Sequence, residues 1–136
     1  MNGLNKANNI EVAKFIRCEN LQDIHELENG KFDNLRVLEI VRTPLVKGIK
    51  LDFQNLRIVV ISRTQICSAD GLRSLVGLTF LDISRNLISS IEPLRNMVEL
   101  EYLNVSDNQL WNVDELQVLI PMKKLRRVYL NNWRLN

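Results

Sequence analysis

A leucine-rich pattern that recurs after 22 residues limits the fold of this chain more than any other feature. Residues 78–88 read L-x-x-L-x-I-x-x-N-x-I, and residues 100–110 read L-x-x-L-x-V-x-x-N-x-L. A period of this length is typical of solenoids, in which each repeat is one structural unit that buries its apolar side against its neighbours. We therefore expect a stack of short repeats.

Further units fall into the same register. Units that begin at Leu35, Leu56 and Leu125 also carry aliphatic residues in their fourth and sixth positions. Residues 1–34 form a degenerate first unit, whose apolar residues indicate a strand of uncertain register followed by an apolar tail: Val12, Phe15, Ile16, Leu21, Ile24 and Leu27. A first unit is expected to be atypical because one of its faces meets solvent.

The spacing within a unit predicts which side chains are buried. Leu81 and Ile83 lie two residues apart, so they point to the same side of a short strand, and Phe80 and Asp82 point to the other. The leucine side becomes core and the other side a displayed surface. Where the strand ends, Asn86 can satisfy backbone groups that no neighbouring strand reaches.

The equivalents of Asn86 in the other units predict a polar ladder through the stack. Its members are Thr43, Thr64, Asn86 and Asn108. A threonine keeps one hydroxyl for the same task, whereas Trp133, which takes this position in the last unit, cannot perform it.

This motif resembles the leucine-rich repeat family. The 22-residue unit is similar to its short-repeat class, which includes the leucine-rich regulatory subunit of protein phosphatase 1, an axonemal dynein light chain and the A-prime protein of a spliceosomal particle. The resemblance implies an α/β solenoid, a leucine-rich repeat horseshoe of about six repeats. Such a horseshoe has a parallel sheet on its concave side and short helical or irregular segments on its convex side.

The predicted organisation is a single leucine-rich repeat domain over residues 1–136. It contains the degenerate N-terminal cap unit (1–34), four repeats (35–124) and a terminal uncapped strand (125–136). Because no segment of the sequence follows this strand, we expect either a partner, Trp133 or a continuation of the natural chain to cover the end.

The convex segments are expected to differ from unit to unit. Pro44 and Gly48 predict that the second unit has no full helix there, and the tails of units 56–77 and 78–99 allow one or two helical turns. The fifth unit is three residues longer, which predicts a short helix that ends near Pro121.

The displayed positions indicate where the chain can bind. The third position gives an apolar stripe of four residues: Val37, Ile58, Phe80 and Tyr102. The eighth position gives an arginine column followed by an acid: Arg42, Arg63, Arg85 and Asp107. The fifth position contributes Glu39, Asp82 and Tyr129, and the second adds Arg36 and Arg57. We expect these residues, apart from Arg36 and Arg57, to form the partner-binding site.

The size of the charge repulsion leaves two interpretations open for the arginine column. Neighbouring strands lie about 4.8 Å apart, so adjacent guanidinium groups repel by roughly 0.8 kcal/mol in water. This cost is tolerable without a ligand, so the arginines can be simply solvated, with Glu39 and Asp82 as counter-charges. The apolar stripe is harder to explain without a partner, because a patch of a few hundred Å² tends to be an interaction site.

Two functions follow from this surface. In the first, the chain is an adaptor or a regulatory or scaffold subunit that binds a protein partner with an apolar and acidic surface, within a larger complex. In the second, the arginines bind RNA phosphates while Phe80 and Tyr102 stack on bases, as in a ribonucleoprotein subunit. Val37 and Ile58 stack poorly and Asp82 and Asp107 repel phosphates, so we favour the protein partner.

Other classes of function have little support in the sequence. We expect no enzymatic activity, cofactor, metal, small-molecule substrate or membrane association, since no Gly-rich phosphate loop, metal-spaced His/Cys cluster or nucleophile motif occurs. Cys18 and Cys67 are widely separated, and we expect inert thiols rather than the disulfide-bonded caps of secreted relatives. With no signal-peptide pattern at the start, we expect an intracellular, cytoplasmic location, with the nucleus and cilium as alternatives.

Overall fold

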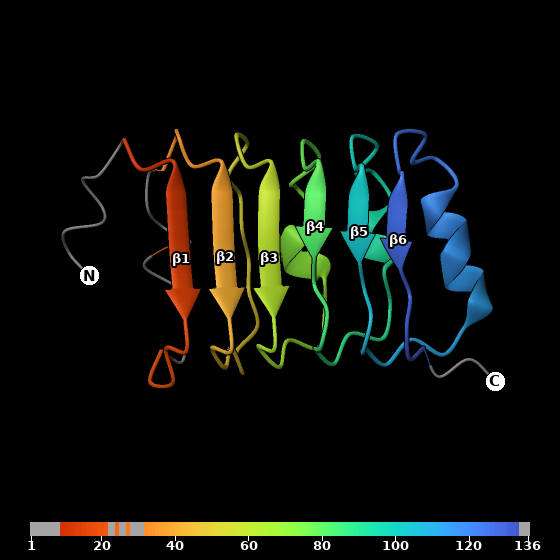
Figure 1. The fold of residues 1–136 in the computed structure, drawn as a ribbon, viewed down its shortest axis with the longest axis horizontal. Coiled ribbons are helices and arrows are strands. Elements are labelled where there is room, and N and C mark those ends of the chain that lie inside the picture. The colour runs from red at the N-terminus through yellow and green to blue at the C-terminus, as the bar shows by residue number, and fades with distance from the viewer. Residues whose placement is uncertain (1–8, 22–23, 25–26, 28–31, 134–136) are drawn as a thin grey trace.

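Six parallel strands lie side by side in sequence order (Figure 1). The computed structural model of the protein describes residues 9–21, 24, 27 and 32–133. The strands are β1 (Val12–Ile16), β2 (Val37–Val41), β3 (Ile58–Ser62), β4 (Phe80–Asp82), β5 (Tyr102–Asn104) and β6 (Arg127–Tyr129). Equivalent positions of successive units pair with one another, as in Ile58 with Phe80 and Phe80 with Tyr102. The predicted solenoid with a parallel sheet is therefore confirmed.

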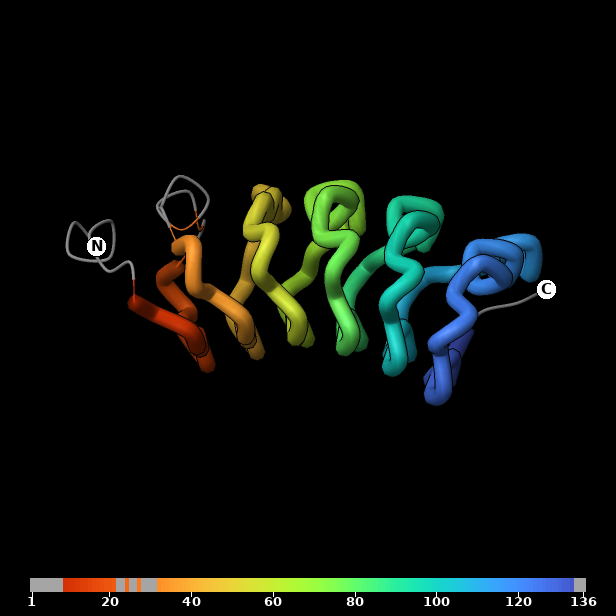
Figure 2. The backbone as a smooth tube through the Cα atoms, turned by 90° about the horizontal axis from the view of Figure 1, so that it is seen from above, coloured from red at the N-terminus to blue at the C-terminus, as the bar shows by residue number. Residues whose placement is uncertain are grey.

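The segments between the strands return along the opposite side of the molecule. In Figure 2 the strands occupy the inner side of a shallow arc and the returning segments fan out along its outer side. Among the described residues, the outer side carries the 3-10 helices η2 (Asp70–Leu72), η3 (Glu92–Leu94) and η4 (Val113–Leu119). We call the strand side the concave face and the other side the convex face.

The convex segments follow the sequence expectations. The segment 42–57, all of it described, contains turns and no helix, and η2 and η3 are single turns. Helix η4 begins after Asn112, whose side chain accepts a hydrogen bond of 2.9 Å from the backbone N–H of Asp114. It ends at Leu119, and its C-cap residue Ile120 directly precedes Pro121. None of the described helices is long and apolar enough to cross a bilayer.

The core consists of the leucine positions that the repeat pattern predicts. In β2 to β5 the fourth and sixth positions have no exposed surface, and these residues are Leu38, Ile40, Val59, Ile61, Leu81, Ile83, Leu103 and Val105. The edge strand β6 is different, because Val128 in the fourth position is 36% exposed. Trp133 is partly buried against the core. Each inner unit is thus covered on two sides by its neighbours, which is how a solenoid builds a core.

The polar ladder joins neighbouring units beneath the strand ends. The carboxamide oxygen of Asn86 accepts hydrogen bonds of 2.9 Å from the backbone N–H and the hydroxyl of Thr64, and its nitrogen donates to the Ile61 carbonyl at 2.7 Å. Asn108 is bonded in the same manner, accepting from Ile88 and donating to Ile83. Thr43 accepts from the backbone N–H of Cys18 at 3.2 Å. Cys18 therefore takes the ladder position of the first unit.

The first unit has one definite register. Val12 pairs with Val37 and Phe15 with Ile40, so Ala13 and Phe15 occupy the fourth and sixth positions and face the core. Val12 and Ile16, which the sequence grouped with Phe15, are instead about half exposed, at 52% and 54%, on the concave face. His25, the single histidine of the sequence, and Leu135 of the last unit lie outside the described residues.

Candidate functional site

The concave face is built from the second, third, fifth, seventh and eighth positions of every unit. The apolar stripe crosses it from strand to strand, because the third positions pair directly: Val37 with Ile58, Ile58 with Phe80 and Phe80 with Tyr102. All four side chains are partly exposed. Val12, whose position the sequence could not assign, extends the stripe onto β1.

Aromatic rings stack at the centre of the stripe. The ring centroids of Phe80 and Tyr102 lie 4.0 Å apart with planes 5° from parallel, and Tyr129 tilts against Tyr102 at 5.4 Å and 44°. Burial, with a smaller contribution from the negative charge of Asp82, raises the pKa of the Tyr102 hydroxyl above its usual value of 10.0. Phe80, Tyr102 and Tyr129 thus form a stacked group of rings, which we call the aromatic wall.

The eighth position of each unit adopts an unusual backbone conformation. Its φ angle is positive, between 51° and 61°, in all six units: Arg17, Arg42, Arg63, Arg85, Asp107 and Asn132. Positive φ is uncommon outside glycine. Here it turns the chain out of the strand and lets each backbone N–H, from Arg17 to Asp107, donate to the seventh-position carbonyl of the next strand, as from Arg42 to Ser62 at 3.0 Å. The turn holds the arginines in a row along one rim.

The arginine column therefore has four members, and sequence reasoning missed the first. Arg17 follows Phe15 by two residues, as Arg42 follows Ile40, so it lies in the same column once β1 is in register with β2. The signal was present in the sequence. It could not be used because the strand of the first unit was uncertain by one residue.

The charges on the concave face are only partly paired. Lys14 pairs with Glu39 at 3.3 Å, and Arg85 pairs with Asp107 at 3.5 Å. Within the described part of the chain, no carboxylate forms an ion pair with Arg17, Arg42 or Arg63. Glu39 pairs with a lysine and Asp82 accepts hydrogen bonds from neutral groups, so neither of them forms an ion pair with an arginine of the column in the described structure.

A polar hollow of about 350 Å³ lies beside the aromatic wall, over β3 to β6. Its lining residues are Ser62, Asp82, Ser84, Arg85, Asn104, Ser106, Asp107, Tyr129 and Asn131. The carboxylate of Asp82 accepts from the backbone N–H of Ser84 at 2.9 Å and from the side chain of Asn104 at 3.3 Å. Ser84 and Ser106, in the seventh position of their units, line this hollow and are each only 7% exposed.

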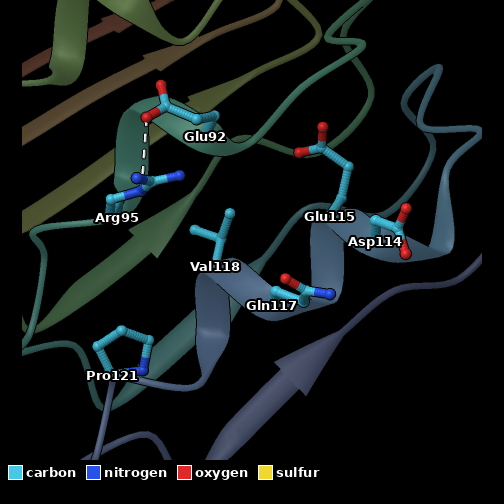
Figure 3. Close-up of a pocket in the computed structure, with 7 residues that line it drawn as sticks. All are labelled: Glu92, Arg95, Asp114, Glu115, Gln117, Val118 and Pro121. Carbon is cyan, nitrogen blue, oxygen red and sulfur yellow. Dashed lines mark ion pairs between the residues drawn. The ribbon is translucent and has the colours of Figure 1, made fainter.

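A second hollow, of about 420 Å³, lies on the convex face between η3 and η4 (Figure 3). Its most prominent acid, Glu115, accepts hydrogen bonds from the Ser90 hydroxyl and from the backbone N–H of Ile91 at 2.7 Å. Glu92 in turn pairs with Arg95 at 3.5 Å. These polar groups connect the fourth and fifth units, so we assign this hollow a structural role.

The described residues contain neither a metal-binding cluster nor a disulfide. Over the residues that the structure describes, no three His, Cys, Asp or Glu side chains lie close enough to hold a metal ion. Cys18 and Cys67 are free cysteines. Cys67 is exposed, and Cys18, at the ladder position of the first unit, is partly buried.

Comparison with known proteins places the fold. No family model and no curated protein matches the sequence, but solved structures of leucine-rich repeat proteins do. Internalin C2 of Listeria monocytogenes aligns with a TM-score of 0.67 and 22% identity over 98% of this chain and 67% of its own. An internalin, InlF, of the same organism gives 0.61 and 18% over 97% and 51%. Human 5T4, or trophoblast glycoprotein, gives 0.52 and 20% over 76% and 54%.

These similarities settle the architecture. The chain spans between about half and two thirds of the length of these structures. Their sequence identities are low, so they establish a common fold and leave the partner open. The chain has the leucine-rich repeat fold, and the predicted horseshoe with a parallel concave sheet is confirmed.

Proposed function

We propose that the chain is a non-enzymatic protein-interaction module, an adaptor or a regulatory or scaffold subunit, that binds a protein partner on its concave face. The observation that supports this most is the unbroken apolar stripe over β1 to β5, bordered along one rim by the arginine column. Apolar surface that stays exposed and continuous over five strands is typical of interaction sites.

The composition of this surface indicates the chemistry of the partner. Phe80 and Tyr102 supply rigid ring surface at the centre, where anchor residues of protein interfaces are usually found. Arg42 and Arg63 are exposed and have no carboxylate partner in the part of the chain that the structure describes, and a guanidinium binds a carboxylate with two parallel hydrogen bonds. The fitting partner has an apolar centre and an acidic flank.

RNA is a weaker candidate for the same surface. A base must lie flat on an aromatic face to gain stacking energy, but Phe80 and Tyr102 already cover one face of each other. Asp82, Glu101 and Asp107 lie around these rings, so a phosphate backbone would meet three carboxylates there as well as the cations Arg126 and Arg127. The protein partner is therefore the better fit.

Two further parts of the proposal concern the class of leucine-rich repeat and the location of the protein in the cell. The strand register repeats every 22 residues from Ile58 through Phe80 to Tyr102, which supports membership of the short-repeat class. The free thiols of Cys18 and Cys67 suit a reducing compartment, which supports an intracellular location.

The experiment that tests the function uses four immobilised baits in an extract of the native cells. The baits are the wild type, Tyr102→Ala, Phe80→Ala and the convex control Arg95→Glu, and captured proteins are quantified by mass spectrometry. We expect a protein that the wild type and Arg95→Glu retain and that both concave variants lose. A partner retained equally by all four baits, or lost only with Arg95→Glu, would move the interface off the concave face.

The nature of the interaction is then read from its salt dependence. With purified partner, affinity should fall modestly between low and high salt, because apolar contacts at the centre are not screened. A steep log-linear fall, together with nuclease-sensitive capture, would identify RNA as the ligand instead.

A further inference from the structure

The concave face is basic over the units of β1 to β3 and acidic over the units of β4 and β5, and the last unit adds two cations, Arg126 and Arg127. On the units of β1 to β3 the cations outnumber the carboxylates Glu11 and Glu39, and these cations are Lys14, Arg17, Arg36, Arg42, Arg57 and Arg63. On the units of β4 and β5, Asp82, Glu101 and Asp107 outnumber Arg85. The apolar stripe runs from one charge region into the other.

Pairing within the face increases this contrast. The one arginine of the acidic region, Arg85, is already bound to Asp107. The carboxylate of Asp82 has no cationic partner in the described structure, where it accepts hydrogen bonds from neutral groups only. At the other end Arg17, Arg42 and Arg63 have no carboxylate partner among the described residues. The unsatisfied charge is therefore positive over β1 to β3 and negative over β4 and β5.

The acidic region has the shape and walls to hold a cationic side chain. Asp82, Asp107 and Tyr129 line the same hollow of about 350 Å³. A lysine or arginine that enters it meets a carboxylate and the face of an aromatic ring, to which cations are attracted. Arg126 and Arg127, the cations of the β6 unit, line hollows nearer the opposite ends of the strands.

We propose that the partner contributes a charge-asymmetric segment that lies in one direction across the strands, with its carboxylates on Arg17, Arg42 and Arg63 and a lysine or arginine in the Asp82–Asp107 hollow. This inference rests on the proposed function, since it concerns the same concave face. It adds the orientation of the partner. A segment bound the other way would place carboxylates near Asp82 and Asp107 and cations on the arginine column, and like charges in contact weaken binding.

Synthetic peptides can test the orientation before the partner is known. The probes have one composition: four glutamates, six leucine or alanine residues and four lysines, with the charges in two end blocks or alternating. Block peptides are made in both sequence directions, since the structure does not fix the direction of the partner backbone. We expect one block peptide to bind the full chain at least about tenfold more tightly than the alternating peptide.

A nitroxide label on the peptide shows how it lies. A label on the glutamate end should broaden the backbone NMR signals of β1 and β2, and a label on the lysine end those of β4 to β6. Equal broadening along the sheet, the reversed pattern, or equal affinity of block and alternating peptides would overturn the proposal.

Variants separate this proposal from the proposed function. The double change Arg17→Glu and Arg63→Glu should remove the preference for the block peptide, whereas Arg95→Glu on the convex face should preserve it. Phe80→Ala should weaken the block and alternating peptides alike. If all peptides bind equally and all depend on Phe80, the orientation is wrong while the concave site stands. If no peptide depends on Phe80, the concave site itself fails.

Discussion

The ring of Phe80 lies on the ring of Tyr102 with their centroids 4.0 Å apart and their planes 5° from parallel. Both residues occupy the third position of their units, and the paired register of β4 and β5 brings them face to face. Because neighbouring strands are about 4.8 Å apart, the two rings fill the space between strands and leave no room for another group. The wall that a partner would meet exists before the partner binds.

A double-mutant cycle measures this contact. Phe80→Ala and Tyr102→Ala should each destabilise the fold modestly, because both side chains are only partly buried, and the two losses should differ from additivity by about 0.5–1.5 kcal/mol. Urea denaturation followed by circular dichroism gives the free energies of unfolding. Strict additivity would mean that the rings do not interact in solution.

The polar ladder makes a prediction about stability. Asn86→Ala leaves the buried N–H of Thr64 and the carbonyl of Ile61 without their partners, so unfolding should become easier by about 1–3 kcal/mol. Asn55 bonds across units too, to the Asp33 carbonyl, but it is exposed and water can replace it. Asn55→Ala is therefore the matched control. Equal shifts in the denaturation midpoint for the two variants would contradict a structural role for the ladder.

Two glycines of the third unit differ in what a side chain would meet. A Cβ at Gly71 would lie 1.5 Å from the backbone carbonyl oxygen of Ile49, so the two convex segments would have to separate. A Cβ at Gly77 would meet the end of the flexible Arg57 side chain, which can move away. We expect Gly71→Ala to cost well over 1 kcal/mol and Gly77→Ala little. Thermal denaturation compares them, and a larger loss for Gly77→Ala would refute the described packing.

The raised pKa of Tyr102 predicts that the stability of the fold depends on pH in the alkaline range. Its pKa is raised in the folded state, mainly by burial, so between its ordinary pKa of 10.0 and the folded value only the unfolded chain releases this proton. The stabilisation that the buried Tyr102 hydroxyl provides is therefore complete below pH 10.0. It is lost as the pH rises through the folded pKa, so the free energy of unfolding decreases over that range. Tyr102→Phe should lose less stability at high pH than the wild type.

An absorbance titration tests the same shift directly. The sequence contains two tyrosines, so in the Tyr129→Phe variant the phenolate absorbance reports Tyr102 alone. Its midpoint should lie above 10.0 in the folded protein and return to the ordinary value in urea. A midpoint at the ordinary value in the folded chain would show that Tyr102 is not desolvated.

The sequence was sufficient to predict the fold and many of the residues that lie on the concave face. The spacing of Leu81 and Ile83 predicts strand, core and register, because a repeat that buries the same two positions in each unit leaves one arrangement for the backbone. It was insufficient where a unit departs from the pattern. Arg17 and Val12 were missed because Phe15 and Ile16 both suit the core position, and only pairing with β2 distinguishes them.

The pattern of ion pairs was the other property that could not be predicted from the sequence. Glu39 is one strand away from both Lys14 and Val60, and nothing in the pattern indicates that it bonds the lysine and leaves the arginines free. Likewise, Ser84 alternates with core residues as a displayed residue should, yet it is buried by its neighbours across the strands, Ser62 among them at 3.2 Å. Such details depend on side-chain rotamers rather than on residue spacing.

The last prediction compares two members of the arginine column that differ in pairing. Arg63 has no carboxylate partner in the described structure, whereas Arg85 is bound to Asp107. If the column binds the acidic flank of a partner, Arg63→Glu should slow association and reduce its salt dependence when the contact lies at the rim, or cost about 2–5 kcal/mol of affinity when it is buried. Arg85→Glu should have a smaller effect, since Asp107 already neutralises that guanidinium. Association and dissociation rates, measured with the captured partner at two salt concentrations, distinguish these cases, and Arg95→Glu provides the convex control. If Arg85→Glu impaired binding more than Arg63→Glu, the free arginines would not be the ones that hold the partner, and the acidic flank would have to lie over β4 and β5.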